Sequence, residues 1–481
     1  MTRFSITTLG CKVNQYDGVA LANKLQRSGL LQSDPHEQTD LVIVNTCCVT
    51  STAMRKSRQT IRKLLRNNIN ATILVTGCYS DYDTKAIARM ITSLGVQKNN
   101  LYVAGHHSNL ADVIDQIVTS LQTNKGEAQQ QIESTESKTD PGGDRESIRA
   151  RRNIAVKSKA GGTREIGVIK VFPNHQRAFV KVQDGCDAFC SYCIVPYTRA
   201  VVWSKTIQQV RDECNDLVNS GHKEIVLAGV FLGAFGRDTS RRSRWDDAKS
   251  TLPELLSEIA SIDGLWRVRL SSLEPGDLSD ELLEVYRTNQ TVAPHFHLPL
   301  QSGSQNILKR MNRQYTAREF RQTIDRVKTA LDDPAITTDI IVGFPGETDE
   351  DFAQTLEMAR YAGFSKIHTF PFSALEGTRA WEYRNETPRG EIVKARIAQL
   401  GQLEAEMAEA FRKKLVGRRL EALVESTRPE PGVRQAMTDR YVTVRFKPPE
   451  NAKLTGKVVA LDIDDIWSGG LYCHSAPSVL Q

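Results

Sequence analysis

The stretch Val182-Gln183-Asp184-Gly185-Cys186-Asp187-Ala188-Phe189-Cys190-Ser191-Tyr192-Cys193 places three cysteines in one short run. Three residues and then two separate the thiols. Thiolates this close in sequence can bind three irons of a cubane cluster and leave the fourth iron open to a substrate or cofactor. A zinc site would normally need a fourth Cys or His nearby, and the next cysteine, Cys214, lies in a predicted helix. Zinc and a disulfide are therefore the less favoured interpretations.

The run belongs to a large chain with the composition of a multidomain protein. Its 481 residues exceed what one hydrophobic core usually supports, so we expect two or three domains. No apolar run reaches membrane-spanning length and the N-terminus has no signal-peptide core, which predicts a cytoplasmic protein without membrane contact. Nine cysteines do not suggest a secreted disulfide framework. The net charge of +6 permits an anionic partner without requiring one.

Upstream of the run, predicted strands alternate with predicted helices. Strands are expected at 4–9, 41–45 and 71–76, and helices around 21–25 and 58–65. A cysteine follows each strand: Cys11, Cys47 and Cys78. Ligands bind at the carboxyl edge of an open parallel sheet, so the pattern predicts a second metal-ligand set. The alternative is three small buried residues. We interpret Cys48 as a non-ligand whose side chain points elsewhere.

Between 125 and 160 the composition shifts to Gln, Ser, Glu, Lys, Gly and Arg, which cannot bury enough apolar surface to fold alone. This segment is a predicted flexible linker, and its basic second half would either contact RNA or be solvated. The chain then divides into an N-terminal α/β domain at 1–124, the linker at 125–170, a central domain at 171–410 and a small C-terminal domain at 411–475.

The central domain is predicted to be a partly closed parallel barrel. Six strands alternate with amphipathic helices, at 178–182, 224–228, 267–271, 295–300, 335–342 and 366–370. The three-cysteine loop follows the first of these strands. Its thiols are therefore expected at the carboxyl rim of the barrel, where active sites of such barrels lie.

The C-terminal domain is predicted to be a small antiparallel β-barrel. Strands are expected at 420–425, 441–446 and 454–461, after a basic helical stretch. Tyr441, Arg445 and Lys447 on such a surface would suit base stacking and phosphate contact. The alternative is an ordinary solvated sheet face.

These motifs together resemble the radical S-adenosylmethionine methylthiotransferases, with a C-terminal domain similar to that family's TRAM domain. The resemblance covers nearly the whole chain except the linker. The matching stretches are 8–16 (TLGCKVNQY), 44–47 (VNTC), 76–79 (TGCY), 193–199 (CIVPYTR), 271–275 (SSLEP), 297–304 (HLPLQSGS) and 338–348 (TDIIVGFPGET). The first stretch looks most like the branch that modifies N6-threonylcarbamoyladenosine beside the tRNA anticodon. Sister branches act on isopentenyladenosine or on an aspartate of a ribosomal protein.

The resemblance implies two [4Fe-4S] clusters, S-adenosylmethionine, a tRNA anticodon stem-loop as substrate, and an electron donor such as flavodoxin or ferredoxin. Cys186, Cys190 and Cys193 would bind the cluster that cleaves S-adenosylmethionine, and the N-terminal cysteines would bind the second cluster. A methylthio group would be added to carbon 2 of the adenine. Expected contacts to S-adenosylmethionine come from Gly343, Pro345, Gly346, Glu274, Asp339, Gln301 and Ser302. Glu274 and Asp339 could equally pair with a neighbouring Arg.

The sequence also departs from the family's pattern. Ala200 to Lys205 replace a Gly and a following Ser-Arg pair, Phe231 replaces an Asn, and Ser80-Asp81 replace the commoner Ala-Gln. None of these changes touches the six expected ligands. Two rival functions stay open: a radical enzyme that uses cobalamin in place of the N-terminal cluster, and an RNA-binding protein with structural metal sites.

Overall fold

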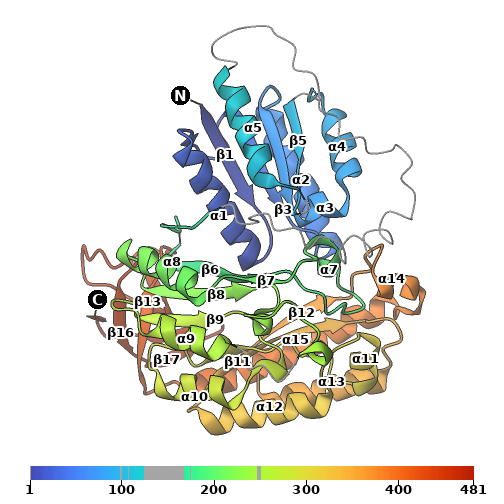
Figure 1. Cartoon of the computed structure of the whole chain (residues 1–481). Helices are drawn as coiled ribbons and strands as arrows, with labels where there is room; N and C mark the ends of the chain where they lie inside the picture. Colours follow the sequence, from blue (N-terminus) through green and yellow to red (C-terminus); the bar gives the residue numbers. More distant parts are fainter. Residues whose placement is uncertain are drawn as a thin grey trace.

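The computed structural model describes residues 2–97, 100–106, 108–123, 167–173, 175–245 and 251–480. The predicted linker lies outside the described residues except for its last four positions. The described chain forms an N-terminal α/β unit, a central barrel and a C-terminal sheet (Figure 1). Among the described residues, no helix is long and apolar enough to cross a membrane.

The N-terminal unit is an open parallel sheet, as predicted, and it has five strands where three were expected. Its strands are β1 (Arg3–Thr8), β2 (Leu31–Gln32), β3 (Leu41–Thr46), β4 (Thr72–Gly77) and β5 (Leu101–Val103), in the order β2-β1-β3-β4-β5. Its helices are α1 (Lys12–Arg27), α2 (Ser51–Asn67), α3 (Cys78–Tyr82), α4 (Thr84–Thr92) and α5 (Leu110–Thr123). The direction of winding reverses between β1 and β3, and such a switch point opens a crevice at the carboxyl edge.

Helices cover both faces of this sheet because apolar side chains point from β3 to either side. Leu41 and Ile43 pack in one core cluster with α1 and α5, while Val42 and Val44 pack in another with α2 and α4. A continuous apolar strand of this kind is typical of a parallel sheet buried on both faces.

The central barrel contains all six predicted parallel strands. They are β6 (Arg177–Asp184), β8 (Glu224–Gly229), β9 (Arg267–Leu270), β10 (His295–His297), β11 (Ala335–Val342) and β12 (Lys366–Pro371). Parallel bridges from Val268 to Val292 and from Ser272 to His297 join β9 to β10. The short β7 (Trp203–Ser204) runs antiparallel on the outer edge of β6, so the barrel is only partly closed.

Helices lie around the barrel, and all of them except the short α7 and α14 contribute buried side chains to the main hydrophobic core. They are α7 (Val195–Thr198), α8 (Ile207–Asn219), α9 (Leu252–Ala260), α10 (Asp280–Thr288), α11 (Gln305–Arg310), α12 (Ala317–Ala330), α13 (Asp349–Ala362), α14 (Arg379–Glu382) and α15 (Gly390–Lys413). Helix α1 also contributes Tyr16 and Ala20 to this core, so the N-terminal unit packs directly against β6.

The C-terminal sheet contains seven short strands in the order β17-β18-β15-β14-β13-β16-β19. The strands are β13 (Arg419–Val424), β14 (Arg434–Thr438), β15 (Thr443–Phe446), β16 (Val458–Asp462), β17 (Asp465–Trp467), β18 (Gly470–Cys473) and β19 (Ser478–Val479). The pairing is antiparallel as predicted, except that β15 and β18 are parallel. β15 and β16 also begin later than predicted, because Tyr441 and Leu454 lie outside the strands.

The C-terminal sheet docks on the amino ends of the barrel strands. Arg269 in β9 donates to the carbonyl of Thr438 at 2.6 Å, and Arg177 at the start of β6 pairs with Glu425 at 2.9 Å. Figure 1 shows these strands, in red, at one end of the barrel, away from α7. The thiols that follow β6 lie at the opposite, carboxyl rim.

Candidate functional site

The first cysteine set, here called the sheet triad, consists of Cys11, Cys47 and Cys78 at the carboxyl edge of the N-terminal sheet. Cys11 follows β1 and Cys47 follows β3, on either side of the switch point, and Cys78 begins α3. Gly10 between β1 and Cys11 has a φ of +102°, and a Cβ there would come within 3.1 Å of Cys47 Sγ. Only glycine allows the backbone to approach the thiol this closely.

Cys78 is the most strongly contacted member of the sheet triad. Arg199 Nε donates to its sulfur at 3.4 Å, and His106 Nε2 lies 3.7 Å away. A hydrogen bond from the Cys48 thiol, helped by Arg199 and His106, holds the pKa of Cys78 well below its ordinary value. The expectation that Cys48 is a non-ligand stays a prediction; its side chain is fully buried in the apolar cluster that also contains Cys78.

The second set, here called the barrel triad, consists of Cys186, Cys190 and Cys193 in the loop after β6. The Cys186 amide donates to the carbonyl of Arg199 at 3.0 Å, and the Cys193 amide donates to that of Cys190 at 2.9 Å. Arg313 Nη1 donates to Cys190 Sγ at 3.1 Å. Each triad thus has one sulfur that accepts an N–H from a buried arginine.

The two triads face one another across the contact between the N-terminal unit and the barrel. Helix α3, which begins at Cys78, packs against α7, which follows Cys193. Burial, together with the neighbouring Cys190 and the more weakly interacting Cys78, raises the pKa of Cys193 to about 12. All nine cysteines of the chain are described and are free thiols, so no disulfide competes for these sulfurs.

The number and type of the sulfur ligands fit clusters better than single metal ions. Each triad offers three free thiols, one fewer than the four ligands of a closed structural zinc site. Four ligands around one zinc ion at about 2.3 Å would place sulfurs about 3.8 Å apart. A cubane instead binds each thiolate on a separate iron, and soft thiolates are its usual ligands. The donor sets therefore fit [4Fe-4S] clusters.

Glu274 lies beside the barrel triad through Arg313. The Arg313 guanidinium pairs with Glu274 Oε1 and donates to the sulfur of Cys190. Glu274 therefore has the neighbouring Arg partner that the alternative interpretation expected. The second oxygen, Oε2, is buried and accepts no hydrogen bond from any described residue, and Arg242 Nη2 lies 3.8 Å from it. A buried carboxylate oxygen without a donor is a suitable acceptor for a cationic amino group. This arrangement fits the expected contact to S-adenosylmethionine.

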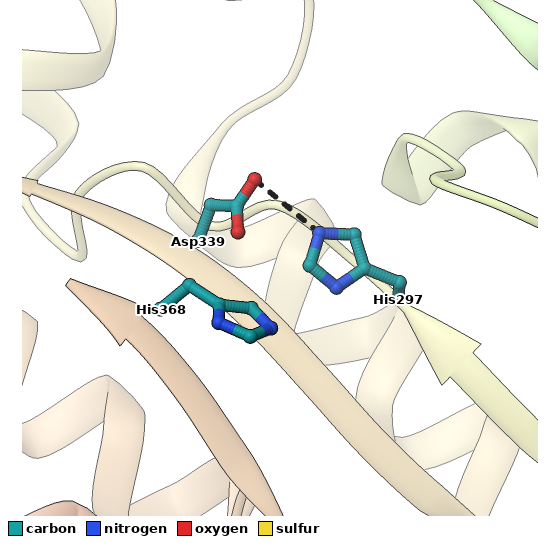
Figure 2. Close-up of side chains that lie close together, drawn as sticks. All are labelled: His297, Asp339 and His368. Carbon is teal, nitrogen blue, oxygen red and sulfur yellow. Dashed lines mark ion pairs between the residues drawn. The ribbon is translucent and has the colours of Figure 1, made fainter. Parts of the chain in front are cut away.

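Asp339 projects into the barrel together with two histidines. His297, Asp339 and His368 come from β10, β11 and β12, and their ligand atoms all lie within 4.8 Å (Figure 2). His297 Nε2 lies 3.3 Å from Asp339 Oδ2, and its Nδ1 lies 2.9 Å from the hydroxyl of Thr337. The sequence analysis did not single out His297 and His368. Each lies in a predicted strand, next to Leu298 and Thr369 respectively, and this local pattern alone indicates no site.

These three side chains line a cavity of about 800 Å³ inside the barrel. Its walls also include Arg269, Lys366 and residues of α15, and Tyr441 to Thr443 line it from the C-terminal sheet. Lys12, which directly follows Cys11, lines the cavity too. The cavity therefore extends to the residue that adjoins the sheet triad, and it is large enough for a modified nucleobase.

The other residues expected to contact S-adenosylmethionine have different surroundings in the structure. Ser302 is fully buried and its hydroxyl bonds Thr355 and the amide of Ser304, so it supports α11 and α13. Gln301 has a φ of +59° and bridges to Ile340 through its backbone.

Gly343, Pro345 and Gly346 form the turn after β11. Gly343 has a φ of +76°, and a Cβ at this position would come within 2.6 Å of a Val393 methyl group. Both the backbone conformation and the close packing therefore require glycine there.

The expected RNA contacts are partly engaged within the protein. The Tyr441 ring stacks on His295 at 4.9 Å and has Arg177 and Arg269 at its face, with 39% of its surface exposed. Arg445 lies 3.7 Å from the Trp467 ring and pairs with Glu430. Lys447, directly after β15, is exposed. Their role in RNA binding stays a prediction.

The three departures from the family pattern have packing partners. Phe231 and Val202 are buried in one small apolar cluster with Cys186 and Ala188, so two of the changed positions pack around the barrel triad. Lys205 forms a buried ion pair with Glu213 at 2.6 Å. Asp81 accepts a hydrogen bond from the amide of His106 at 2.7 Å and so fixes the loop that carries this histidine.

The chain matches two family models along its length. A model described as uncharacterized protein family UPF0004 matches residues 3–96, and one described as the radical SAM superfamily matches residues 180–359. The two matches correspond to the N-terminal unit and to the greater part of the barrel. Each match contains one cysteine triad.

Curated relatives are similar over nearly the full chain. The threonylcarbamoyladenosine tRNA methylthiotransferase MtaB of Bacillus subtilis is 33% identical, over 96% of this chain and 94% of its own. The tRNA-2-methylthio-N(6)-dimethylallyladenosine synthase of Desulfitobacterium hafniense is also 33% identical, over 96% and 95%. Among solved structures, the radical S-adenosylmethionine methyltransferase TsrM of Kitasatospora setae matches with a TM-score of 0.51 and 14% identity, over 90% of this chain and 81% of that one. This last likeness concerns the fold alone.

Proposed function

The chain belongs to the tRNA methylthiotransferases of the radical SAM superfamily, in the MtaB branch, and we propose that it adds a methylthio group to carbon 2 of N6-threonylcarbamoyladenosine beside the tRNA anticodon. It is a radical SAM enzyme, and its superfamily implies S-adenosylmethionine and a [4Fe-4S] cluster. Relatives named for the threonylcarbamoyl and the dimethylallyl substrate are equally identical to it. Identity alone therefore does not choose the base.

The observation that carries the proposal is the pair of facing cysteine triads. The barrel triad would hold the cluster that binds S-adenosylmethionine, and the sheet triad would hold a second cluster. When bound, the cofactors supply a radical able to remove hydrogen from an aromatic carbon, and the sulfur and methyl group that replace it. No protein base could remove such a proton, so the side chains bind and orient the reactants.

Different side chains of the described chain would bind S-adenosylmethionine and the base. Arg313 orients Glu274, whose second oxygen would accept from the amino group of S-adenosylmethionine. The cavity lined by His297, Asp339 and Lys12 would receive the base, and Lys12 directly follows Cys11 of the sheet triad. The carboxylate of a threonylcarbamoyl group suits the ammonium of Lys12 in the cavity wall better than an apolar dimethylallyl group would.

The proposed partners are a tRNA anticodon stem-loop and an electron donor such as flavodoxin or ferredoxin. Lys447 and the exposed part of Tyr441 would contact the RNA. The reaction consumes electrons to cleave S-adenosylmethionine, so a reduced donor is required. We expect these encounters to take place in the cytoplasm, where tRNA is modified.

The test is an assay of reconstituted enzyme on two anticodon stem-loops that differ only at the modified adenosine. One carries the threonylcarbamoyl group and the other an isopentenyl group. The proposal expects methylthiolation of the first at a kcat/KM at least tenfold higher. Preference for the second would reassign the substrate, and modification of a ribosomal-protein peptide in place of both would reject a tRNA base.

A further inference from the structure

Arg199 forms hydrogen bonds with a cysteine of each triad. Its backbone carbonyl accepts from the amide of Cys186 at 3.0 Å, and its side-chain Nε donates to the sulfur of Cys78 at 3.4 Å. It follows α7 and lies six positions after Cys193 in sequence. A small movement of this residue would therefore displace ligands of both sites.

Carboxylates from both structural units fix the rest of the guanidinium. Nη1 donates to both oxygens of Asp184 at 2.8 Å, and Nη2 donates to Asp17 at 2.6 Å. Asp184 ends β6 in the barrel, whereas Asp17 lies in α1 of the N-terminal unit. A bidentate pair and a second carboxylate leave the arginine a single orientation.

Lys181 completes the same buried network. It pairs with Asp17 at 2.5 Å and with Asp184 at 3.1 Å, so two cations face two carboxylates. The four side chains are between 4% and 11% exposed. Lys181 shares both carboxylates with Arg199, but its ammonium donates to these carboxylates and not to a cysteine sulfur. It is therefore a matched control for the network itself.

We infer that Arg199 is a positioning residue that couples the two cofactor sites. It fixes the position of the sheet triad relative to the barrel triad. The hydrogen bond from its N–H to the sulfur of Cys78 makes the N-terminal cluster easier to reduce. Hydrogen bonds to ligand sulfurs stabilise the reduced, more negative state of such a cluster. Partners of this kind orient the ligands they contact and tune the metal centre. The inference rests on the proposed function, since it assumes a cluster on the sheet triad.

The test isolates that cluster in the full chain. A parent variant with Cys186, Cys190 and Cys193 all changed to Ala retains only the sheet triad. After anaerobic reconstitution, iron and sulfide are counted, and the reduction of the cluster is titrated by electron paramagnetic resonance. About four irons in the parent establish the cluster, and none would contradict the proposed function rather than the role of Arg199.

Two changes are then added separately to the parent: Arg199→Gln and Lys181→Gln. We expect Arg199→Gln to shift the reduction equilibrium at least tenfold toward the oxidised cluster, which is about 59 mV for one electron. Lys181→Gln should shift it less than threefold. Equal shifts in the two variants, or none in Arg199→Gln, would overturn the inference, because the effect would then belong to the network or be absent.

A third variant covers the case in which Arg199→Gln fails to hold iron. Arg199→Lys keeps the charge but loses the planar fork, so it should retain the cluster with an intermediate reduction equilibrium. Loss of iron from both Arg199 variants, with retention in Lys181→Gln, also supports the positioning role. Loss from all three would overturn it, because any break in the network would then have the same result.

Discussion

Arg313 donates a hydrogen bond to the sulfur of Cys190 at 3.1 Å, although the two residues lie 123 positions apart in the chain. The same guanidinium pairs with Glu274 and is only 6% exposed. One arginine thus places a carboxylate, with one oxygen left for a ligand, beside a cysteine of the barrel triad. This relationship defines the binding position for the amino group of S-adenosylmethionine in our account.

Changing Glu274 to Gln should therefore weaken binding of S-adenosylmethionine more than it slows the chemistry. A hydrogen bond to a charged group contributes about 1.5–3 kcal/mol, so we expect KM for S-adenosylmethionine to rise tenfold or more. The measurement is the rate of deoxyadenosine formation against S-adenosylmethionine concentration. Asp280→Asn, at an exposed carboxylate, is the control. An unchanged KM in Glu274→Gln would remove this residue from the site.

The two triads should separate in their effects on the two half-reactions. Cys190→Ala should abolish cleavage of S-adenosylmethionine, because its cluster would lose one of three ligands. Cys78→Ala should keep cleavage and stop methylthiolation. Cys214→Ala, at a buried cysteine outside both triads, should keep both activities. Cleavage at the wild-type rate in Cys190→Ala would contradict the assignment of the barrel triad.

Breaking the buried pair of Lys205 and Glu213 should strongly destabilise the protein. Their side chains are 2% and 0% exposed, and Tyr16 of α1 donates to the same carboxylate at 2.7 Å. Removing one partner leaves an unpaired buried charge, which costs about 3–5 kcal/mol. Lys205→Met should thus lower the thermal unfolding midpoint by several degrees, and Lys205→Met with Glu213→Leu should recover much of the loss. Equal midpoints for Lys205→Met and the wild type would contradict this.

Phe231 and Val202 should be energetically coupled, since both pack in the cluster around Cys186. Phe231→Ala should destabilise the protein by about 3 kcal/mol through the cavity it leaves. A double-mutant cycle with Val202→Ala should give a coupling energy of about 0.5–3 kcal/mol in chemical denaturation. Strict additivity would show that the two side chains do not support one another in this cluster.

The sequence predicted those parts of the site that depend on local pattern. Cys11, Cys47 and Cys78 each follow a strand, and the barrel strands recur between amphipathic helices, so spacing located them even where a strand is as short as β10. The two-residue β2 and β19 carry too few side chains for any periodicity. Tyr441 lies in a turn with a φ of +60°, which a stretch rich in β-branched residues did not reveal.

The contacts of the triads could not be predicted in this way. Arg199, Arg313 and His106 reach their cysteines across 121, 123 and 28 positions, and such contacts depend on tertiary packing. Arg199 stood in a recognised motif, but nothing local indicated that its side chain faces the N-terminal unit. His106 follows β5, a strand of three residues that the sequence did not indicate.

The most direct test of the central claim is nucleoside mass spectrometry of tRNA from cells with and without this protein. Our account predicts that the 2-methylthio derivative of N6-threonylcarbamoyladenosine disappears without the protein and returns with the wild-type chain, but not with Cys78→Ala. The unmethylthiolated nucleoside should accumulate in its place. An unchanged level of the methylthio derivative, or loss of the isopentenyl derivative instead, would contradict the account.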